Sequence, residues 1–474
     1  MADSKDIALM AHLMRRAGFG ASREELEMRV AKGYEATVEE LLDPDGHGIP
    51  DLDDREICRH NPGYVFPSGN QPNAMAYWVY RMINSKRPLE EKIALFWHQV
   101  FATSFIKVGP PMMMDQIQMF RDYGFGSYRD LLMQVSMDPG MLKWLDNVDN
   151  HKDSGNENWG RELLELFSMG QGNYTEEDVK EVSRAFTGWT VGQGAVGAGG
   201  AGAFLKNIFQ YLPEDHDDGE KVILGHRGRF NGEDVIDLIM KHPATTRFVS
   251  RHIYNFFVGD EVQVPSWQDV APADPVALNI IGEAFQSSNY DIRQTLRVIF
   301  NSDFFKDEKN WCSKVKSPVE LIIGTMKLVK HHQRPEPFLT DIAMETEYQG
   351  QTILGPPSVE GWHTGHEWID SGQLVERINF VGDHVGNSQF AGVRSIIDRL
   401  ATQEELSPED LVDGCLDLVG PIKVADGTRL ELIAHAEANG PAKRGTSEEE
   451  KAAFTDRVTE MLRLITAVRE YQLG

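Results

Sequence analysis

The sequence predicts a mainly α-helical fold: a large multi-helix bundle with little or no sheet, built as one unit or as two helical lobes. Three observations predict it. Apolar residues recur at three- and four-residue spacing along most of the chain, and Ser and Thr capping signals precede several of these stretches. Residues 221–224 form the one modest strand candidate. With 474 residues, 41% of them hydrophobic, the chain can bury a large core, which excludes extensive disorder.

The first half of the chain is expected to be a series of short helices. Ile7, Met10 and Leu13 form one apolar face, and Ser22 begins the second helix with Glu25 as its capping partner. Residues 43–70 show little periodicity and are expected to form a long loop. A second capping box is expected where Ser154 precedes Glu157 by three residues. The expected helices lie at residues 5–16, 22–33, 37–42, 74–84, 88–98, from 112 onward, at 157–168 and from 175 to about 188.

The middle of the chain suggests a division. Residues 191–203 are almost all glycine and alanine and are expected to be a flexible linker or an insertion. They separate an N-terminal helical region, 1–190, from a C-terminal helical region, 204–474, unless both belong to one continuous domain. The text Gly192-Gln-Gly194-Ala-Val-Gly197 matches a dinucleotide-binding fingerprint, but no buried strand precedes it, so no nucleotide is expected.

Helical periodicity returns after this segment. A Gly-, Pro- and Trp-rich loop is expected at residues 349–370, and Ser447 with Glu450 caps a last helix that reaches about Tyr471. The other helices of the second half are expected at residues 232–241, 244–257, 274–287, 291–301, 371–386 and 391–403.

Charge and targeting signals limit the possible functions. The formal net charge of −26 disfavours nucleic acids and anionic membranes as partners. Cys58, Cys312 and Cys415 show neither disulfide nor zinc spacing. No signal peptide and no run of about 18 apolar residues is recognisable, so a soluble cytoplasmic protein is expected.

The densest group of polar residues lies at 146–165. Asp146 and nearby carboxylates have the chemistry to collect a hard cation, but His151 stands where an EF-hand requires glycine, which excludes that motif. Glu157 and Arg161 are four residues apart, as in a solvated ion-pair ladder. Glu162 lies at the edge of the apolar face, where partial burial would raise its pKa toward values useful for acid–base chemistry.

Histidines provide the other candidates. His216 and Asp217 are suited to bind a metal or to act as a base with its orienting carboxylate, or else form an acidic turn. His98 follows Phe96 and Trp97 on an apolar helix, where a histidine is more often a core residue. His363 and His366, three residues apart, suit metal ligation or a packed loop.

The sequence resembles the bacterial family catalogued as domain of unknown function 1800. The resemblance begins with His12-Leu-Met-Arg15-Arg16-Ala-Gly18-Phe-Gly20 and includes Lys316-Ser317-Pro318. The family usually has a second glycine where His363 stands, so the 361–368 loop departs from its pattern. The remaining similar stretches are residues 87–92, 96–98, 101–104, 138–142, 145–146, 156–158, 161–167, 170, 172–176, 178–179, 187–189, 216–217, 221, 356–357 and 361–362.

The resemblance implies a helical fold and a set of polar positions, but no agreed reaction. It also implies a partner, because relatives are often encoded beside a sulfatase-like protein. Two functions are open: a hydrolase-like enzyme with its carboxylate and histidine groups in one polar cleft, or a non-catalytic binding or assembly protein whose polar motifs are caps and networks.

The enzyme hypothesis makes a geometric prediction. Its candidate groups must lie within about 10 Å of one another to act on one substrate. The expected catalytic residues are Glu162, His98, His216 and Asp217. The expected substrate-binding residues are Asn156, Glu157, Asn158, Arg161, Lys221 and Trp189. A divalent metal ion is a possible cofactor, with His216, Asp217 and Asp146 as its candidate ligands.

Overall fold

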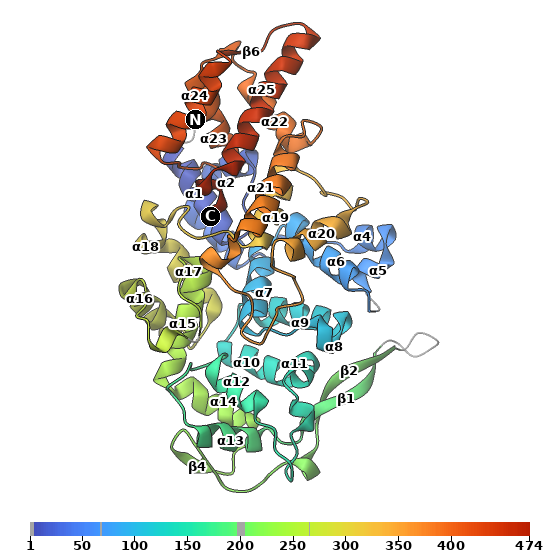
Figure 1. Cartoon of the computed structure of the whole chain (residues 1–474). Coiled ribbons are helices and arrows are strands. Elements are labelled where there is room, and N and C mark those ends of the chain that lie inside the picture. The colour runs from blue at the N-terminus through green and yellow to red at the C-terminus, as the bar shows by residue number, and fades with distance from the viewer. Residues whose placement is uncertain (1–3, 67–68, 197–203, 265) are drawn as a thin grey trace.

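The computed structural model describes residues 4–66, 69–196, 204–264 and 266–474, and it is mainly helical, as predicted. Figure 1 shows the helices of the two ends of the chain together in one part of the molecule, with the middle of the chain in the other. Three small two-stranded sheets are the β-structure of the described residues.

The N-terminal third packs short helices around two longer ones, α6 and α7. The side chain of Ser22 accepts a hydrogen bond from the Glu25 amide and begins α2, as expected. The loop expected at residues 43–70 instead contains α4 and α5, which are too short to show a periodic pattern. The helices are α1 (Ser4–Arg16), α2 (Arg23–Lys32), α3 (Tyr34–Leu42), α4 (Arg55–His60), α5 (Pro62–Val65), α6 (Gln71–Asn84), α7 (Pro88–Val100), α8 (Phe105–Val108), α9 (Pro110–Tyr123), α10 (Tyr128–Met137) and α11 (Pro139–Trp144).

The middle third contains the two larger corrections. The capping box predicted at Ser154 and Glu157 is wrong: Ser154 exchanges backbone hydrogen bonds with His151, and Glu157 itself precedes the helix. The elements are α12 (Asn158–Glu165), α13 (Glu176–Ala185), β1 (Trp189–Val196), β2 (Phe204–Tyr211), β3 (Lys221–Ile223), β4 (His226–Gly228), α14 (Gly232–Lys241), α15 (Pro243–Phe257), α16 (Pro275–Ser287), α17 (Ile292–Asn301) and α18 (Asp303–Lys306).

The segment expected to be a flexible linker is, over residues 191–196, part of a strand. β1 pairs antiparallel with β2 from Trp189 opposite Tyr211 to Val196 opposite Phe204. Residues 197–203 of the expected linker lie outside the described residues. Glycine-rich composition hid the strand, because the ladder hydrogen bonds come from the backbone and the pairing partner, β2, supplies the bulky side chains. In Figure 1 this hairpin projects from the side of the bundle.

The C-terminal third returns to the N-terminal helices. Capping boxes at Ser317 and Ser447 begin α19 and α25, the second as predicted. The elements are α19 (Pro318–Val329), α20 (Leu339–Tyr348), α21 (Ser371–Val385), α22 (Ala391–Leu400), β5 (Glu405–Leu406), α23 (Pro408–Leu418), α24 (Asp426–Ala438), β6 (Ala442–Lys443) and α25 (Glu448–Ala467). Within the described residues, 3₁₀ turns lie at Asn147–Asp149, Pro213–Asp215, Ser266–Gln268, Glu308–Asn310, Gly365–Trp368 and Arg469–Gln472.

One hydrophobic core joins distant parts of the chain. The buried cluster extends from Ile7 to Tyr471. The Lys316 amide donates to the Gln472 carbonyl at 2.9 Å, so the segment before α19 pairs with the end of the chain. His12 in α1 lies 3.1 Å from the Phe305 carbonyl through its Nε2. Within the described residues, no helix is both long and apolar enough to cross a membrane.

Candidate functional site

His98 lies in α7 and is fully buried between two indole rings. The ring centroids of Trp78 and Trp362 are 5.6 and 5.1 Å from its own. Neither of its ring nitrogens has a hydrogen-bond partner among the described residues. Burial lowers the pKa of His98 to about 3, so the imidazole is neutral at physiological pH.

Glu162 is half-buried on α12, at the edge of its apolar face as expected. Burial, with the negative charges of Glu165 and Glu360 nearby, raises the pKa of Glu162 to about 7, and Arg161 opposes this. Glu360 lines a cavity of about 30 Å³ together with Trp362, the residue that covers His98. The 360–362 segment therefore links the surroundings of Glu162 to those of His98.

His216, Asp217 and Lys221 form a separate group beside α13. The Nδ1 atom of His216 lies 3.0 Å from the Thr187 carbonyl, and Arg184 donates to Asp217 at 2.7 Å. The ammonium of Lys221 is bound by the carbonyls of the 217–219 turn. Their described contacts hold a turn against a helix, and none of them leads to His98 or Glu162.

The remaining candidates make local contacts. Arg161 forms two 2.8 Å contacts with Glu176 and a longer one, 3.4 Å, with Glu157. Asp146 has a φ of 56° and pairs with Lys107. The side chain of Asn156 accepts from the Asn158 amide, and the Trp189 indole donates to Asn231. These contacts are those of ion pairs, turns and caps, and they bring the predicted residues to several different places.

A second grouping, which the sequence reasoning missed, surrounds a cavity of about 70 Å³ between α1, α19 and the end of the chain. We call it the cationic cavity. Such a volume holds a few waters or one small oxyanion. Its charged lining residues are Arg15, Arg16, Lys314, Lys316 and Glu320.

Two of the cations near this cavity have carboxylate partners. Lys92, which is fully buried in α7, pairs with Glu320, and Lys314 pairs with Asp260 at 3.0 Å. The Glu320 carboxylate also accepts from the Ser317 amide as part of the cap of α19. Burial opposes ionisation of Glu320, but Lys92 and Lys314 overcome it and hold its pKa at about 2.

The other cations are bound by neutral groups only. Arg15 donates to the Gly420 carbonyl and Arg16 to the Asn310 carbonyl, while the Nε of each is buried without a partner. The Lys316 ammonium donates to the Tyr471 carbonyl at 2.7 Å. Behind it, Arg377 donates to the Lys316 carbonyl and to Gln472, and its Nη1 has no partner among the described residues.

This leaves an excess of positive charge in a buried place. Within the described part of the chain, no carboxylate forms an ion pair with these cations, which are Arg15, Arg16, Lys316 and Arg377. Burial lowers the pKa of Lys316 to about 7, with Arg15 and Arg377 contributing. Burial also lowers the pKa of Arg377 to about 10. Uncompensated buried charge destabilises the folded state, so the arrangement is suited to receive an anion.

Arg15, Arg16 and Lys316, which line the cationic cavity, come from two stretches quoted for the family resemblance. These are residues 12–20 and 316–318, which are far apart in the sequence. Their presence in those stretches was the one signal that pointed to them. Nothing local in the sequence indicated that they meet.

The family comparison agrees with that resemblance. Residues 12–473 match the family model described as "Protein of unknown function (DUF1800)", and the chain therefore belongs to this family. No curated protein and no solved structure matches the chain.

Proposed function

We propose that the protein binds a small oxyanion, or the carboxylate, sulfate or phosphate group of a larger ligand, in the cationic cavity. One observation carries the proposal: Arg15, Arg16 and Lys316 line one buried space without a carboxylate partner among the described residues. Guanidinium groups present paired N–H donors that match the oxygens of such anions. A bound anion would compensate charges whose burial is otherwise unfavourable.

The local charge also contrasts with the rest of the molecule. The formal net charge is −26, so most of the surface repels anions. Because acidic residues outnumber basic ones, the overall composition does not account for this compact group of cations. It provides a site where an anion is attracted at short range and where water is largely excluded, which strengthens each interaction.

The test is thermal unfolding of the full chain with sulfate and phosphate, at constant ionic strength in sodium chloride. At about 10 mM anion and a dissociation constant near 1 mM, the expected rise in Tm is about 1–3 °C. The variants Arg15→Gln and Lys316→Gln should lose this rise. Without anion both should be at least as stable as the wild type, because each removes a partly buried charge that has no carboxylate partner among the described residues.

The matched control is Arg429→Gln. Arg429 is exposed on α24 and pairs with Asp413 at 2.7 Å, so this variant should keep the full response to sulfate. The proposal fails if neither anion raises the Tm of the wild type, or if Arg15→Gln responds as the wild type does.

A hydrolase-like activity is the second candidate, and Glu162 is the observation that favours it. This carboxylate combines a pKa of about 7 with a position next to Glu360, and general acid–base catalysts are commonly tuned to this range. Chromogenic ester and glycoside substrates would detect such an activity. Glu162→Gln should abolish it, while the variant of the exposed Glu177, Glu177→Gln, should not. Activity that survives Glu162→Gln would contradict this assignment.

We also propose a cytoplasmic location and the sulfatase-like partner implied by the family resemblance. Cys58, Cys312 and Cys415 are all unpaired, which supports a reducing compartment. Cell fractionation tests the location. Co-purification with the tagged full chain tests the partner, and a chain recovered without any sulfatase-like protein would count against it.

A further inference from the structure

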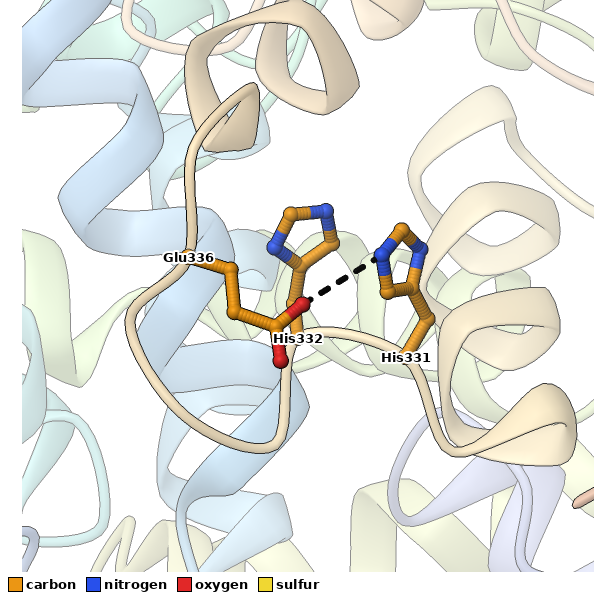
Figure 2. A group of neighbouring side chains, drawn as sticks. All are labelled: His331, His332 and Glu336. Carbon is orange, nitrogen blue, oxygen red and sulfur yellow. Dashed lines mark ion pairs between the residues drawn. The ribbon is translucent and has the colours of Figure 1, made fainter. Parts of the chain in front are cut away.

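His331, His332 and Glu336 gather in the loop between α19 and α20, as Figure 2 shows. One ligand atom from each side chain lies within 4.8 Å of the other two. The Nε2 atom of His331 is 3.5 Å from the Glu336 carboxylate, and the two imidazole centroids are 3.9 Å apart. The three groups therefore surround one small space.

The imidazole of His332 is buried without hydrogen-bond partners among the described residues. The residue is 1% exposed, and neither of its ring nitrogens has a hydrogen bond among the described residues. The Nδ1 of His331 is also buried and unpartnered. Buried polar atoms without partners are costly and uncommon in folded proteins, and these imidazole nitrogens are not engaged by any described residue.

The backbone holds the loop in an unusual conformation. Lys330 and His332 have positive φ values of 57° and 53°, which are rare for residues other than glycine. The Asn84 side chain donates to the His332 carbonyl at 2.9 Å and anchors the turn to the end of α6. Strained backbone of this kind is often found where it positions side chains for a ligand.

The protonation state suits metal binding. Burial and the neighbouring His331 and His384 lower the pKa of His332 to about 4, and burial also lowers that of His331. Both imidazoles are therefore neutral at physiological pH, the form that binds metal ions. Glu336 is exposed and would supply a carboxylate oxygen and one negative charge.

A third imidazole lies nearby. The His384 ring centroid is 6.1 Å from that of His331, and its Nδ1 is 2.6 Å from the Phe380 carbonyl. Such a backbone contact fixes the orientation of the ring in many metal sites. His384 thus lies beside the cluster.

We propose that His331, His332 and Glu336 bind one divalent transition-metal ion, best matched by Zn²⁺. Two imidazole nitrogens and one carboxylate oxygen are the ligand types of zinc, whereas calcium and magnesium prefer oxygen alone. With three protein ligands, one position of a tetrahedral ion stays open to water or another ligand. Among the described residues, these three are the His, Cys, Asp or Glu side chains whose ligand atoms lie close enough together, within 4.8 Å of one another, to hold one metal ion.

The metal site is independent of the anion proposal. α19 separates the two: Lys316 precedes this helix of 12 residues and His331 follows it, and the helix is about 18 Å long. Either site can therefore fail its test without affecting the other.

The experiment is calorimetric titration of chelator-treated full chain with Zn²⁺, with Co²⁺ absorption as a second readout of the ligand geometry. The wild type should bind one equivalent. His331→Gln and Glu336→Gln should each weaken the Zn²⁺ affinity by more than about tenfold. Loss of a residue that only supports a ligand already weakens metal affinity by about tenfold or more, and each of these variants loses a ligand itself. These two side chains are only partly buried, so both variants should fold, and circular dichroism checks this.

The matched control is His363→Gln. His363 also faces a glutamate, Glu367, at 2.5 Å, but the pair is exposed and no third ligand group meets it within the described residues. This variant should bind Zn²⁺ as the wild type does. The proposal is overturned if the wild type binds less than one equivalent, if His331→Gln and Glu336→Gln bind unchanged, or if His363→Gln weakens binding equally.

Discussion

Glu91 and Lys92 are neighbours on α7, both are fully buried, and they form ion pairs with different partners. Glu91 faces two arginines, Arg81 of α6 and Arg121 of α9, at 2.9 Å each. Lys92 pairs with Glu320 of α19, which lines the cationic cavity. Adjacent helical residues point about 100° apart, so one turn of α7 joins two charge networks that would otherwise be unrelated.

Replacing Glu91 by glutamine should strongly destabilise the protein. The change leaves Arg121 buried without a carboxylate and leaves Arg81 with only the more exposed Asp51 and Asp54, at a cost of about 3–5 kcal/mol in the free energy of unfolding. Denaturant unfolding at neutral pH measures it. The exposed pair Arg429–Asp413 provides the control, since Asp413→Asn should cost no more than about 1 kcal/mol.

The effect of Glu91→Gln should also depend on pH. Burial raises the pKa of Glu91, but Arg121 and Arg81 outweigh it and hold the pKa below its ordinary value. A carboxyl with a depressed pKa stabilises the fold above its unfolded-state pKa and loses this contribution as the pH falls through the folded-state pKa. The difference between wild type and variant should therefore shrink on acidification. A difference that is constant from neutral pH into the acid range would contradict the assignment.

Sulfate binding in the cationic cavity should weaken as the pH rises above 7. Lys316 has a pKa of about 7 in the free protein, lowered by burial and by Arg15 and Arg377, and raised slightly by Cys312 and Glu320. Below this pH the ammonium is already charged and the affinity should be constant. Above it, binding requires proton uptake, and the affinity should fall by up to about tenfold per pH unit. Calorimetry between pH 6 and 9 measures this.

The variant Lys316→Arg tests the cause of that pH dependence. An arginine keeps its charge throughout this range, so sulfate affinity should become nearly independent of pH while binding persists. A pH dependence identical to that of the wild type would show that another group titrates.

Glu162→Gln should stabilise the protein at neutral and alkaline pH but not in acid. The folded-state pKa of Glu162, about 7, lies above its ordinary value because of burial and of Glu165 and Glu360. The stability that it contributes is present below the unfolded-state pKa and is lost as the pH rises through 7. With its partial exposure, the expected gain at pH 8 is about 1–2 kcal/mol. Equal stability of wild type and variant at pH 8 would contradict the raised pKa.

Gly392→Ala should disrupt the contact between α22 and α19. A Cβ atom at Gly392 would lie 2.0 Å from the Leu328 carbonyl oxygen and 2.7 Å from the backbone of Val329. Backbone cannot move aside as a flexible side chain does, so a loss of about 3 kcal/mol or more is expected on thermal or denaturant unfolding. At Gly382, within α21, a Cβ atom meets nothing within 4 Å. Gly382→Ala should therefore leave stability unchanged or raise it by up to about 1 kcal/mol.

The sequence by itself determined the helical class and many of the helix boundaries. The apolar periodicity and the caps at Ser22 and Ser447 depend on contacts within a few residues, so they can be recognised from a short stretch of sequence. The position of Glu162 at the edge of an apolar face, and the raised pKa that follows from it, were predictable for the same reason.

The tertiary structure alone decided the strand β1 and the two groups of side chains on which the proposals rest. β1 exists because β2 pairs with it, and its own glycines gave no sign of this. Arg15, Arg16 and Lys316 line one cavity only because α1 packs against the start of α19 and the end of the chain. His331 and Glu336 face each other only because the backbone turns sharply at Lys330 and His332. A charged side chain acquires an unusual pKa or lacks a partner because it is buried. Burial depends on how the whole chain packs rather than on residues that are neighbours in the sequence.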